Sequence, residues 1–331
     1  MDAFEKKTLK TSRGYTYTYY VADGDKSLPT LFFQHGWPDH AAMWKDVAGP
    51  LRSTKHPIII PDMLGYDGTD KPTDPSVYKW NVMTKDMVEI LDAEGAEKCI
   101  SIGHDWGSGA ASRFYHYHPD RVAGLVNLNV PYLPPTREPF DLETANKRTK
   151  QVFGYSLLAY WHLFTAPDGP EILKGNLERL FNLLHGDGDT MKTYFCGNDE
   201  MRNYLTGKTD ATINLRPYAK DATFKKTFVD RMSRDGFEGP QCWYKATSQN
   251  HQHECDKELP GGIDVVQVPA LYIGCKQDAV CRPEAMYESI QKGLLPKLEQ
   301  AEMIDAAHWS SYEAPQEVVM RLEAWLKKNY K

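Results

Sequence analysis

The segment Gly103-His104-Asp105-Trp106-Gly107 has the pattern most suggestive of chemistry, an acidic residue flanked by two glycines. It follows an apolar run and precedes a helical pattern, as does a sharp strand-to-helix turn in which only small neighbours fit around a nucleophile. Serine usually occupies the central position, which here is Asp105. An ordinary turn with a helix-capping aspartate is the alternative interpretation. A carboxylate is ionised at neutral pH and can attack a saturated carbon that bears a leaving group, forming an ester.

Two residues farther along the chain complete a candidate catalytic set. Asp278 follows the apolar segment "LYIGCKQ", and His308 lies in "DAAHW" after the last expected strand. The order nucleophile, acid, histidine, with each residue after a strand, predicts a triad at one sheet edge. A rival acid position after "GLVNL" holds Asn129 and Val130, which leaves Asp278 as the acid. Taken singly, Asp278 could be a turn residue and His308 a packed histidine.

The segment "FFQHGWPD" is the third component, because a Gly-Pro loop after a strand is a position for an oxyanion hole. We expect the backbone N–H groups of Trp37 and Trp106 to stabilise the oxyanion. His308 would activate the water that hydrolyses the Asp105 ester, and Asp278 would orient the histidine. A halide or the oxygen of an epoxide would suit as leaving group, and the alkoxide needs an acid that donates to it.

Short apolar segments alternate with helical patterns along most of the chain, which predicts a mostly parallel sheet covered by helices. The expected strands are 14–22, 29–35, 56–62, 98–104, 123–130, 268–274 and 297–305, and the clearest helices are 80–95 and the segment from Pro315.

This alternation is interrupted between the proline-rich segment "YLPPTREP" and residue 268, where only helical patterns occur. We therefore predict a catalytic sheet domain formed by residues 1–133 and 251–331. A helical cap, residues 134–250, is predicted as an insertion after the sixth strand. The segment "NHQHEC" has metal-ligand residue types at a spacing that matches no familiar site, so a polar loop is expected there and no metal is predicted.

The composition is that of a globular protein, with 331 residues, 41% hydrophobic and 25% charged residues, and a formal net charge of −6. The acidic balance argues against binding to nucleic acid or anionic membranes. The charged N-terminus lacks the apolar stretch of a signal peptide, and no apolar run reaches the roughly 20 residues that span a membrane. Six scattered cysteines indicate no disulfide framework. We expect a soluble, cytoplasmic monomer or homodimer.

In combination, these motifs make the sequence resemble the epoxide hydrolases of the α/β-hydrolase superfamily. The elements are "HGWPD", "GYDGTDKP", "GHDWGS", "KQD" after a strand and "DAAHW", and the resemblance extends over essentially the whole chain. It implies an α/β-hydrolase fold, a small-molecule epoxide and water as substrates, and no cofactor. Thr165, Ser108 and Asp67 depart from residues frequent in that family, which bears on substrate fit more than on mechanism.

The resemblance also implies roles for two tyrosines as donors to the epoxide oxygen. In that family one cap tyrosine lies four residues before a Phe-x-x-Pro segment, and "YWHLFTAP" places Tyr160 there. A second lies in a Gly-Pro-x-x-Trp-Tyr motif, and "GPQCWY" gives Tyr244. From the residues alone, such tyrosines are most often packing residues. Aromatic side chains further predict an apolar pocket for hydrophobic or aryl epoxides, lined by Trp37, Phe153, Tyr155, Trp161, Phe164 and Trp243.

Three alternatives use the same residues differently. A haloalkane dehalogenase would also use Asp105 and His308, with Trp106 and Trp161 as halide donors. Against it, Trp37 stands where one group of those enzymes has asparagine, and the paired tyrosines would have no role. An epoxide-opening cyclase would attack with the substrate's own hydroxyl. A non-catalytic receptor on the same fold has no need of an intact triad.

Overall fold

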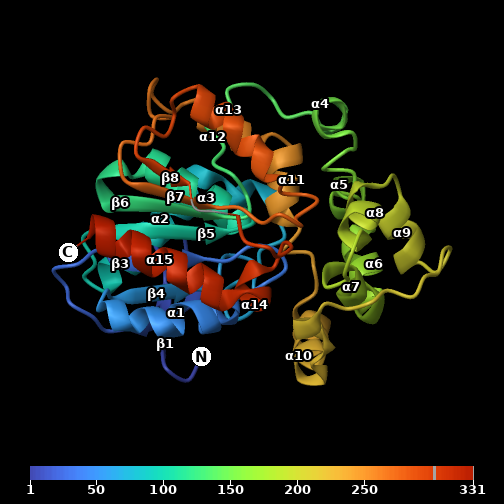
Figure 1. The fold of residues 1–331 in the computed structure, drawn as a ribbon, viewed down its shortest axis with the longest axis horizontal. Coiled ribbons are helices and arrows are strands. Elements are labelled where there is room, and N and C mark those ends of the chain that lie inside the picture. Colours follow the sequence, from blue (N-terminus) through green and yellow to red (C-terminus); the bar gives the residue numbers. More distant parts are fainter. Residues whose placement is uncertain (301–302, 331) are drawn as a thin grey trace.

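The structure is a computed structural model that describes residues 1–300 and 303–330. Its strands are β1 (Glu5–Lys10), β2 (Thr16–Ala22), β3 (Thr30–Gln34), β4 (Ile58–Pro61), β5 (Cys99–His104), β6 (Val122–Leu128), β7 (Ala270–Ile273) and β8 (Leu298–Gln300). They form one eight-stranded sheet in the order β1-β2-β4-β3-β5-β6-β7-β8 (Figure 1). β2 pairs antiparallel with β1 and β4, and every pair from β4 to β8 is parallel. The predicted mostly parallel sheet is confirmed.

The helices flank this sheet and fill the long connection between β6 and β7. The α-helices are α1 (Lys45–Leu51), α2 (Trp80–Ala93), α3 (Trp106–Tyr117), α4 (Leu142–Phe153), α5 (Trp161–Phe164), α6 (Gly169–Gly175), α7 (Leu177–Leu184), α8 (Thr190–Cys196), α9 (Glu200–Leu205), α10 (Ala222–Asp235), α11 (Cys242–Ser248), α12 (His251–Asp256), α13 (Met286–Gln291), α14 (Ser310–Glu313) and α15 (Pro315–Asn329). Short 3₁₀ helices are η1 (Ala41–Trp44), η2 (Arg52–Thr54), η3 (Pro75–Tyr78), η4 (Pro119–Arg121), η5 (Pro217–Lys220) and η6 (Pro283–Ala285).

The central strands are buried on both faces, which explains why their sequences are continuous apolar runs. Successive side chains of a strand point to opposite faces. Leu31 and Phe33 of β3 therefore belong to the core that includes residues of α1 and α15. Phe32 belongs to the opposite core, where its ring lies 5.9 Å from that of Phe114 in α3. The sheet is thus the middle of three layers.

Each predicted strand overlaps an observed one, from β2 to β8, whereas β1 was not predicted. The strand expected at 297–305 is observed as β8, Leu298–Gln300. Ala301 and Glu302, which also belong to the expected strand, lie outside the described residues. The polar loop expected at "NHQHEC" is wrong, since helix α12 begins at His251. The Gln252 side chain in that helix is buried and pairs with the backbone of Tyr78 and Trp80, which ties the helix to the sheet body.

The inserted segment, residues 134–250, follows β6, the sixth strand, and contains helices α4 to α11. Figure 1 shows α4 to α10 gathered to one side of the sheet, whereas α11 lies beside it. Trp243 of α11 anchors this contact, because its indole N–H donates to the carbonyl of Leu64 at 2.9 Å. The division of the chain into a catalytic domain and a cap at residues 134 and 250 stays a prediction.

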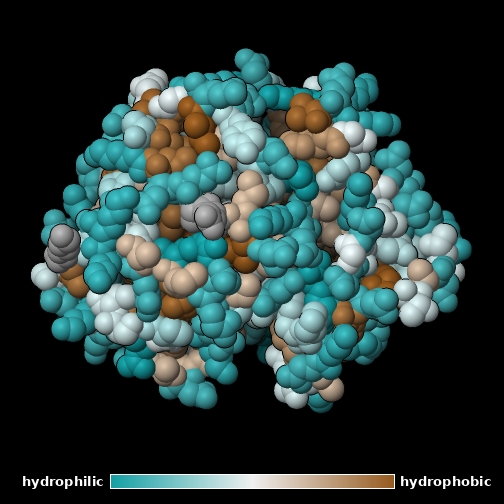
Figure 2. Space-filling model, in the orientation of Figure 1, coloured by the Kyte–Doolittle hydropathy of each residue, from teal (hydrophilic) through white to brown (hydrophobic). Residues whose placement is uncertain are grey.

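The outer surface in the view of Figure 2 is mostly hydrophilic, with hydrophobic groups near α13 and α4. Among the described residues, exposed large apolar side chains on these two helices include Val152 on α4 and Ile290 on α13. Among the described residues, no helix combines the length and the apolar character that crossing a membrane requires.

Two glycines allow α3 to begin directly against the sheet. A Cβ on Gly107 would lie 2.0 Å from the carbonyl oxygen of Gln34 at the end of β3. A Cβ on Gly103 would lie equally close, 2.0 Å, to the carbonyl oxygen of Gly107. Both contacts are with backbone atoms, so only a shift of α3 or β3 would relieve them. The glycine spacing that flags the turn in the sequence is therefore a steric requirement.

We expect Gly107→Ala to lower the free energy of unfolding by about 3 kcal/mol, the upper range for an added group in a close-packed site. Urea denaturation followed by circular dichroism measures this change. Gly49→Ala in α1 is the matched control, because a Cβ there meets no atom within 4 Å. It should leave stability unchanged or raise it by up to about 1 kcal/mol. Equal stabilities of the two variants would contradict the steric explanation.

Candidate active site

Asp105 occupies the turn between β5 and α3 in a backbone conformation that is rare for a residue with a side chain, φ 54° and ψ −126°. The turn directs its carboxylate into a cavity. The backbone N–H of Trp37 donates to Asp105 Oδ1 at 2.8 Å, and the backbone of Trp106 also donates to this carboxylate. The other oxygen, Oδ2, faces His308 Nε2 at 3.5 Å. Oδ1 is thus held by the Trp37 backbone and Oδ2 faces the histidine.

The loop that carries Trp37 is fixed by the buried side chain of His35. Its Nδ1 donates to the carbonyl of Gly36 at 2.9 Å, and its Nε2 accepts the Met63 backbone N–H at 2.9 Å. Burial lowers the pKa of His35 to about 3, so the ring stays neutral and keeps one donor and one acceptor. Gly36 is required beside it, because a Cβ there would lie 2.3 Å from Asp105 Oδ1.

His308 and Asp278 form a buried pair next to Asp105. His308 Nδ1 lies 2.7 Å from Asp278 Oδ2, an oxygen that also accepts from Asn129 Nδ2 at 3.0 Å. Asp278 Oδ1 accepts the backbone N–H groups of Val280 and Cys281 at 3.0 and 2.8 Å. Four hydrogen bonds therefore hold a carboxylate that is fully buried. This fixes the orientation of the His308 ring, with Nε2 toward Asp105.

Asp278, Asp105 and His308 shift one another's pKa values. Burial raises the pKa of Asp278, but the charge of His308 and its hydrogen bond outweigh that effect and lower it to about 2. For Asp105, burial likewise opposes and the hydrogen bond and charge of His308 lower the pKa. For His308, burial lowers the pKa, but Asp278 and the other neighbours raise it well above its usual value. The resting site therefore holds two carboxylates and one imidazolium.

The loop around His308 is held from two sides. His104, at the end of β5, donates from Nε2 to the carbonyl of His308 at 2.7 Å. Asp39, in the loop after β3, accepts from Trp309 Nε1 at 2.8 Å and from the Tyr312 hydroxyl at 2.7 Å. Residues at the carboxyl ends of two strands, β3 and β5, thus fix the loop that carries the imidazole.

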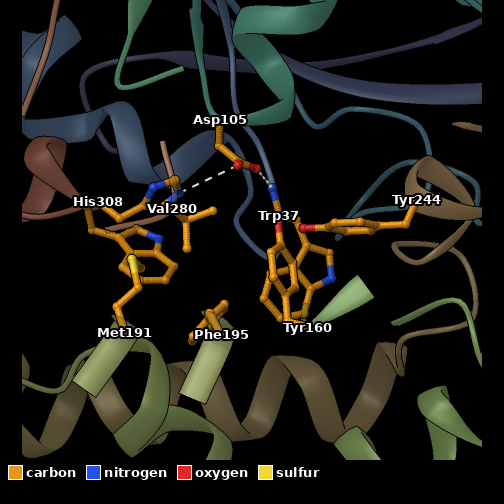
Figure 3. Close-up of a pocket in the computed structure, with 9 residues that line it drawn as sticks. Trp37, Asp105, Tyr160, Met191, Phe195, Tyr244, Val280 and His308 are labelled. Carbon is orange, nitrogen blue, oxygen red and sulfur yellow. Dashed lines mark hydrogen bonds and ion pairs between the residues drawn. The ribbon is translucent and has the colours of Figure 1, made fainter. Parts of the chain in front are cut away.

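Tyr160 and Tyr244 come from the inserted segment and line the same cavity as Asp105. Figure 3 shows their hydroxyl ends pointing toward Asp105, with Met191 and Phe195 on the opposite side. Their ring centroids lie 5.9 Å apart. Burial raises the pKa of both phenols well above the usual value, so they stay neutral donors. The cavity has a volume of about 20 Å³, which is room for a water molecule.

Of the predicted pocket residues, Trp37 lines this cavity and the other five do not. Phe164 lies behind Trp37, with ring centroids 4.4 Å apart. Trp243 donates to the carbonyl of Leu64, Tyr155 donates to the carbonyl of Ala279 at 2.9 Å, and the Trp161 ring lies tilted against that of Trp106, with centroids 5.7 Å apart. The remaining residue, Phe153, ends helix α4 and is half-buried. These rings support the wall of the cavity from behind or lie away from it.

The apolar part of the cavity comes from residues that the sequence analysis missed. They are Met191 and Phe195 on α8, Val280 two residues after Asp278, and Trp309 directly after His308. Val280 and Trp309 could have been predicted, because they lie next to Asp278 and His308 in the sequence. The i, i+4 spacing of Met191 and Phe195 shows a shared helix face, but nothing in it indicates that the face points to Asp105.

Among the described residues, two groups of side chains have donor atoms close enough to hold a metal ion. One oxygen of Asp105, Cys281 Sγ and a ring nitrogen of His308 lie within 4.8 Å of one another. His40, Asp62 and Asp67 form the second such group, in which Asp67 also binds Arg234. Burial raises the pKa of the Cys281 thiol to about 12, so it is not a thiolate nucleophile at neutral pH.

Comparisons with known proteins agree with this fold. Residues 29–315 match the family model described as alpha/beta hydrolase fold. The chain is 29% identical over 304 residues to bifunctional epoxide hydrolase 2 of Rattus norvegicus, covering 91% of this chain and 52% of the relative. The chain therefore spans about half the length of that curated relative.

Two further relatives are matched over nearly their whole length. Epoxide hydrolase srdG of Neurospora crassa is 29% identical over 318 residues, covering 93% of this chain and 90% of the relative. The crystal structure of epoxide hydrolase A from Mycobacterium thermoresistibile superposes with a TM-score of 0.77 and 25% identity, covering 98% of both chains. The fold of this chain thus matches that of a solved structure over almost its entire length.

The electrostatics of His308 give a test that needs no substrate. Because Asp278 holds the imidazolium, we expect His308 to stay protonated well above its usual pKa. Asp278→Asn removes the charge but keeps an acceptor, and should lower the pKa of His308 by about 1–3. An NMR titration of the imidazole measures both values. A wild-type His308 with an ordinary pKa, or one unaffected by Asp278→Asn, would show that the pair is not coupled in this way.

Proposed function

Because this chain belongs to the α/β-hydrolase fold family, we propose that it is an epoxide hydrolase that opens a small-molecule epoxide to a vicinal diol through an ester on Asp105. The observation that carries this proposal is the placement of two neutral phenols, Tyr160 and Tyr244, in one cavity with a carboxylate at the nucleophile position. The names of the similar proteins support it. A cytoplasmic location and a monomeric or dimeric state stay predictions.

In the first step, Asp105 Oδ2 attacks a carbon of the epoxide ring. Oδ2 is the proposed nucleophile because Oδ1 already accepts the Trp37 N–H at 2.8 Å. A C–O bond forms between the substrate carbon and Oδ2, and the C–O bond of the ring breaks on the opposite side. The negative charge moves from Asp105 to the ring oxygen. Because the lowered pKa keeps Asp105 ionised, no base is needed for this step.

Tyr160 and Tyr244 stabilise the oxygen that leaves the ring carbon. An unaided alkoxide is a strong base, so its departure is slow unless a donor shares a proton with it. Both phenols are buried and neutral, and one of them gives its proton to the alkoxide while the second donates a hydrogen bond. Two donors that meet the charge only as it develops stabilise the transition state more than the substrate.

In the second step, water hydrolyses the ester with His308 as base. Esterification removes the charge of Asp105 and with it the ionised acceptor of the hydrogen bond that helps to raise the pKa of His308. The imidazolium therefore loses its Nε2 proton more readily in the intermediate than in the resting site, and the tyrosine that gave up its proton in the first step takes it. His308 Nε2 then takes a proton from water, whose oxygen attacks Asp105 Cγ. The oxyanion forms at Oδ1, where the N–H of Trp37 donates. It collapses as the bond between Cγ and Oδ2 breaks, and the leaving diol oxygen takes a proton from His308, which regains one from the new Asp105 carboxyl group.

The inserted segment acts as a cap in this proposal, because it supplies Tyr160, Tyr244, Met191 and Phe195 to the cavity. The apolar lining favours an epoxide with apolar substituents. A cavity of about 20 Å³ is smaller than any such substrate, so the walls must separate to admit it. The size of the epoxide substituents that the enzyme accepts therefore depends on how far α8 and the loop of Val280 move apart.

The alternatives make different products from the same nucleophile. A haloalkane dehalogenase would release halide and leave the two tyrosines without a role. A cyclase would give a cyclic ether from a hydroxy-epoxide and incorporate no oxygen from water. Halide release and product analysis with an epoxide, a chloroalkane and a hydroxy-epoxide therefore separate the three activities.

We expect His308→Gln to form the Asp105 ester but to hydrolyse it at least about 10³-fold more slowly, since the water loses its base. Intact-protein mass spectrometry after addition of styrene oxide should show one added substrate mass, located by peptide mapping on Asp105. The double variant Asp105→Asn, His308→Gln is the control and should stay unmodified. Normal turnover by His308→Gln would rule out this role for the histidine.

Tyr160→Phe and Tyr244→Phe should each slow formation of the ester by roughly 10²–10³-fold, as the loss of an oxyanion donor does. The double variant should nearly abolish it, and the effects should be non-additive because either phenol partly replaces the other. Single-turnover kinetics measure these rates. Tyr194→Phe is the matched control, since Tyr194 lies on α8 outside the cavity lining. Normal ester formation by the double variant would identify the tyrosines as packing residues.

A further inference from the structure

A third side chain with a metal-ligand atom lies beside the proposed nucleophile and base. Cys281 Sγ lies within 4.8 Å of both an oxygen of Asp105 and a ring nitrogen of His308. No step of the proposed mechanism uses this thiol. Its backbone N–H, in contrast, has a structural role as a donor to Asp278 Oδ1 at 2.8 Å. The side chain therefore brings sulfur chemistry into the site without a part in hydrolysis.

The three donor types and their spacing suit Zn²⁺. At usual bond lengths, nitrogen and oxygen ligands of a tetrahedral zinc ion lie about 3.4 Å apart. His308 Nε2 and Asp105 Oδ2 are separated by 3.5 Å, so this edge of a tetrahedron is already formed. Rotation of the Cys281 side chain about its Cα–Cβ bond would adjust the third ligand. Thiolate and imidazole are the ligands that favour zinc over magnesium or calcium.

The surroundings of His308 also match those of a zinc ligand. Histidines that bind metals usually donate their second ring N–H to a carboxylate, which orients the ring and raises its basicity. His308 Nδ1 lies 2.7 Å from Asp278 Oδ2, so Nε2 is the free ligand atom. The adjoining cavity of about 20 Å³ has room for a water as fourth ligand.

We propose that Asp105, Cys281 and His308 bind one Zn²⁺ ion and that this ion reversibly inhibits the enzyme. On binding, the thiol proton and the proton on His308 Nε2 leave to solvent, and zinc takes their place. The ion then occupies the lone pairs of Asp105 and of His308, so ester formation and ester hydrolysis both stop. Inhibition rests on the proposed epoxide hydrolase function, whereas binding of the ion does not.

The other three-donor group, His40, Asp62 and Asp67, is a weaker candidate for zinc. It offers no sulfur, and the guanidinium of Arg234 already pairs with Asp67. A spectroscopic signal from sulfur therefore distinguishes the two places.

The test of binding uses Co²⁺ as a zinc analogue, because a cobalt–thiolate bond adds charge-transfer absorption in the near ultraviolet. Titration of the whole chain with CoCl₂ should give this band with one ion bound per chain, and ZnCl₂ should displace it. Cys281→Ser keeps the backbone N–H and should lose the band. The control is Cys196→Ser on α8, whose sulfur lies 3.8 Å from the carbonyl of Ala279 and outside the donor group. It should keep the band.

Absence of the band in the wild-type chain, its persistence in Cys281→Ser, or its loss in Cys196→Ser would each overturn the assignment. The second measurement is the rate of styrene oxide hydrolysis at increasing ZnCl₂, relative to each variant's own rate in chelator. Cys281→Ser should need about tenfold or more zinc for half-inhibition. An unchanged zinc dependence would overturn the inhibition. A chain that binds cobalt through Cys281 but never hydrolyses epoxides would instead overturn the proposed function.

Discussion

The backbone of Asp105 is the constraint on which the site depends. A residue with a side chain at φ 54° and ψ −126° is strained by about 1–3 kcal/mol, and it persists only where its surroundings determine it. Here β5 leads into the turn and α3 leads out of it. Gly107 lets α3 pack against the end of β3, and Gly103 lets β5 and the start of α3 approach each other. This backbone conformation places the carboxylate above the edge of the sheet. Relaxation of this one residue would withdraw the carboxylate from Trp37 and His308 together.

The second requirement is the balance of buried charge. Asp105, His308 and Asp278 lie in a row, and the central imidazolium partly neutralises two carboxylates that burial alone would protonate. Asp278 is further compensated by two backbone N–H groups and by the amide of Asn129. In the proposed reaction the charge of Asp105 passes to the substrate oxygen. The histidine then faces one carboxylate instead of two, which converts it from a counter-ion into a base.

Sequence reasoning succeeded where chemistry and local sterics coincide. The strands β2 to β8, the glycine-bounded turn and the chain order of Asp105, Asp278 and His308 all depend on short segments with strong patterns. β1 was missed because it is an exposed edge strand with the sequence EKKTLK, which lacks an apolar run. Asn129 was read only as a missing acid, yet it completes the hydrogen bonds of Asp278. The predicted pocket and the observed cavity share only Trp37, because an aromatic residue in a sequence indicates burial but not which neighbour its ring faces.

The origin of the cavity lining separates two kinds of evolutionary change. The ionised groups all lie on loops of the sheet, whereas four neutral side chains come from the inserted segment: Tyr160, Met191, Phe195 and Tyr244. Met191 and Phe195 project from α8, a helix of seven residues whose apolar side chains hold no charge in place. Substitutions in that helix would therefore change the shape of the cavity without displacing Asp105, Asp278 or His308. A duplicated gene could acquire a new substrate range through a few codons of this segment while inheriting its chemistry intact.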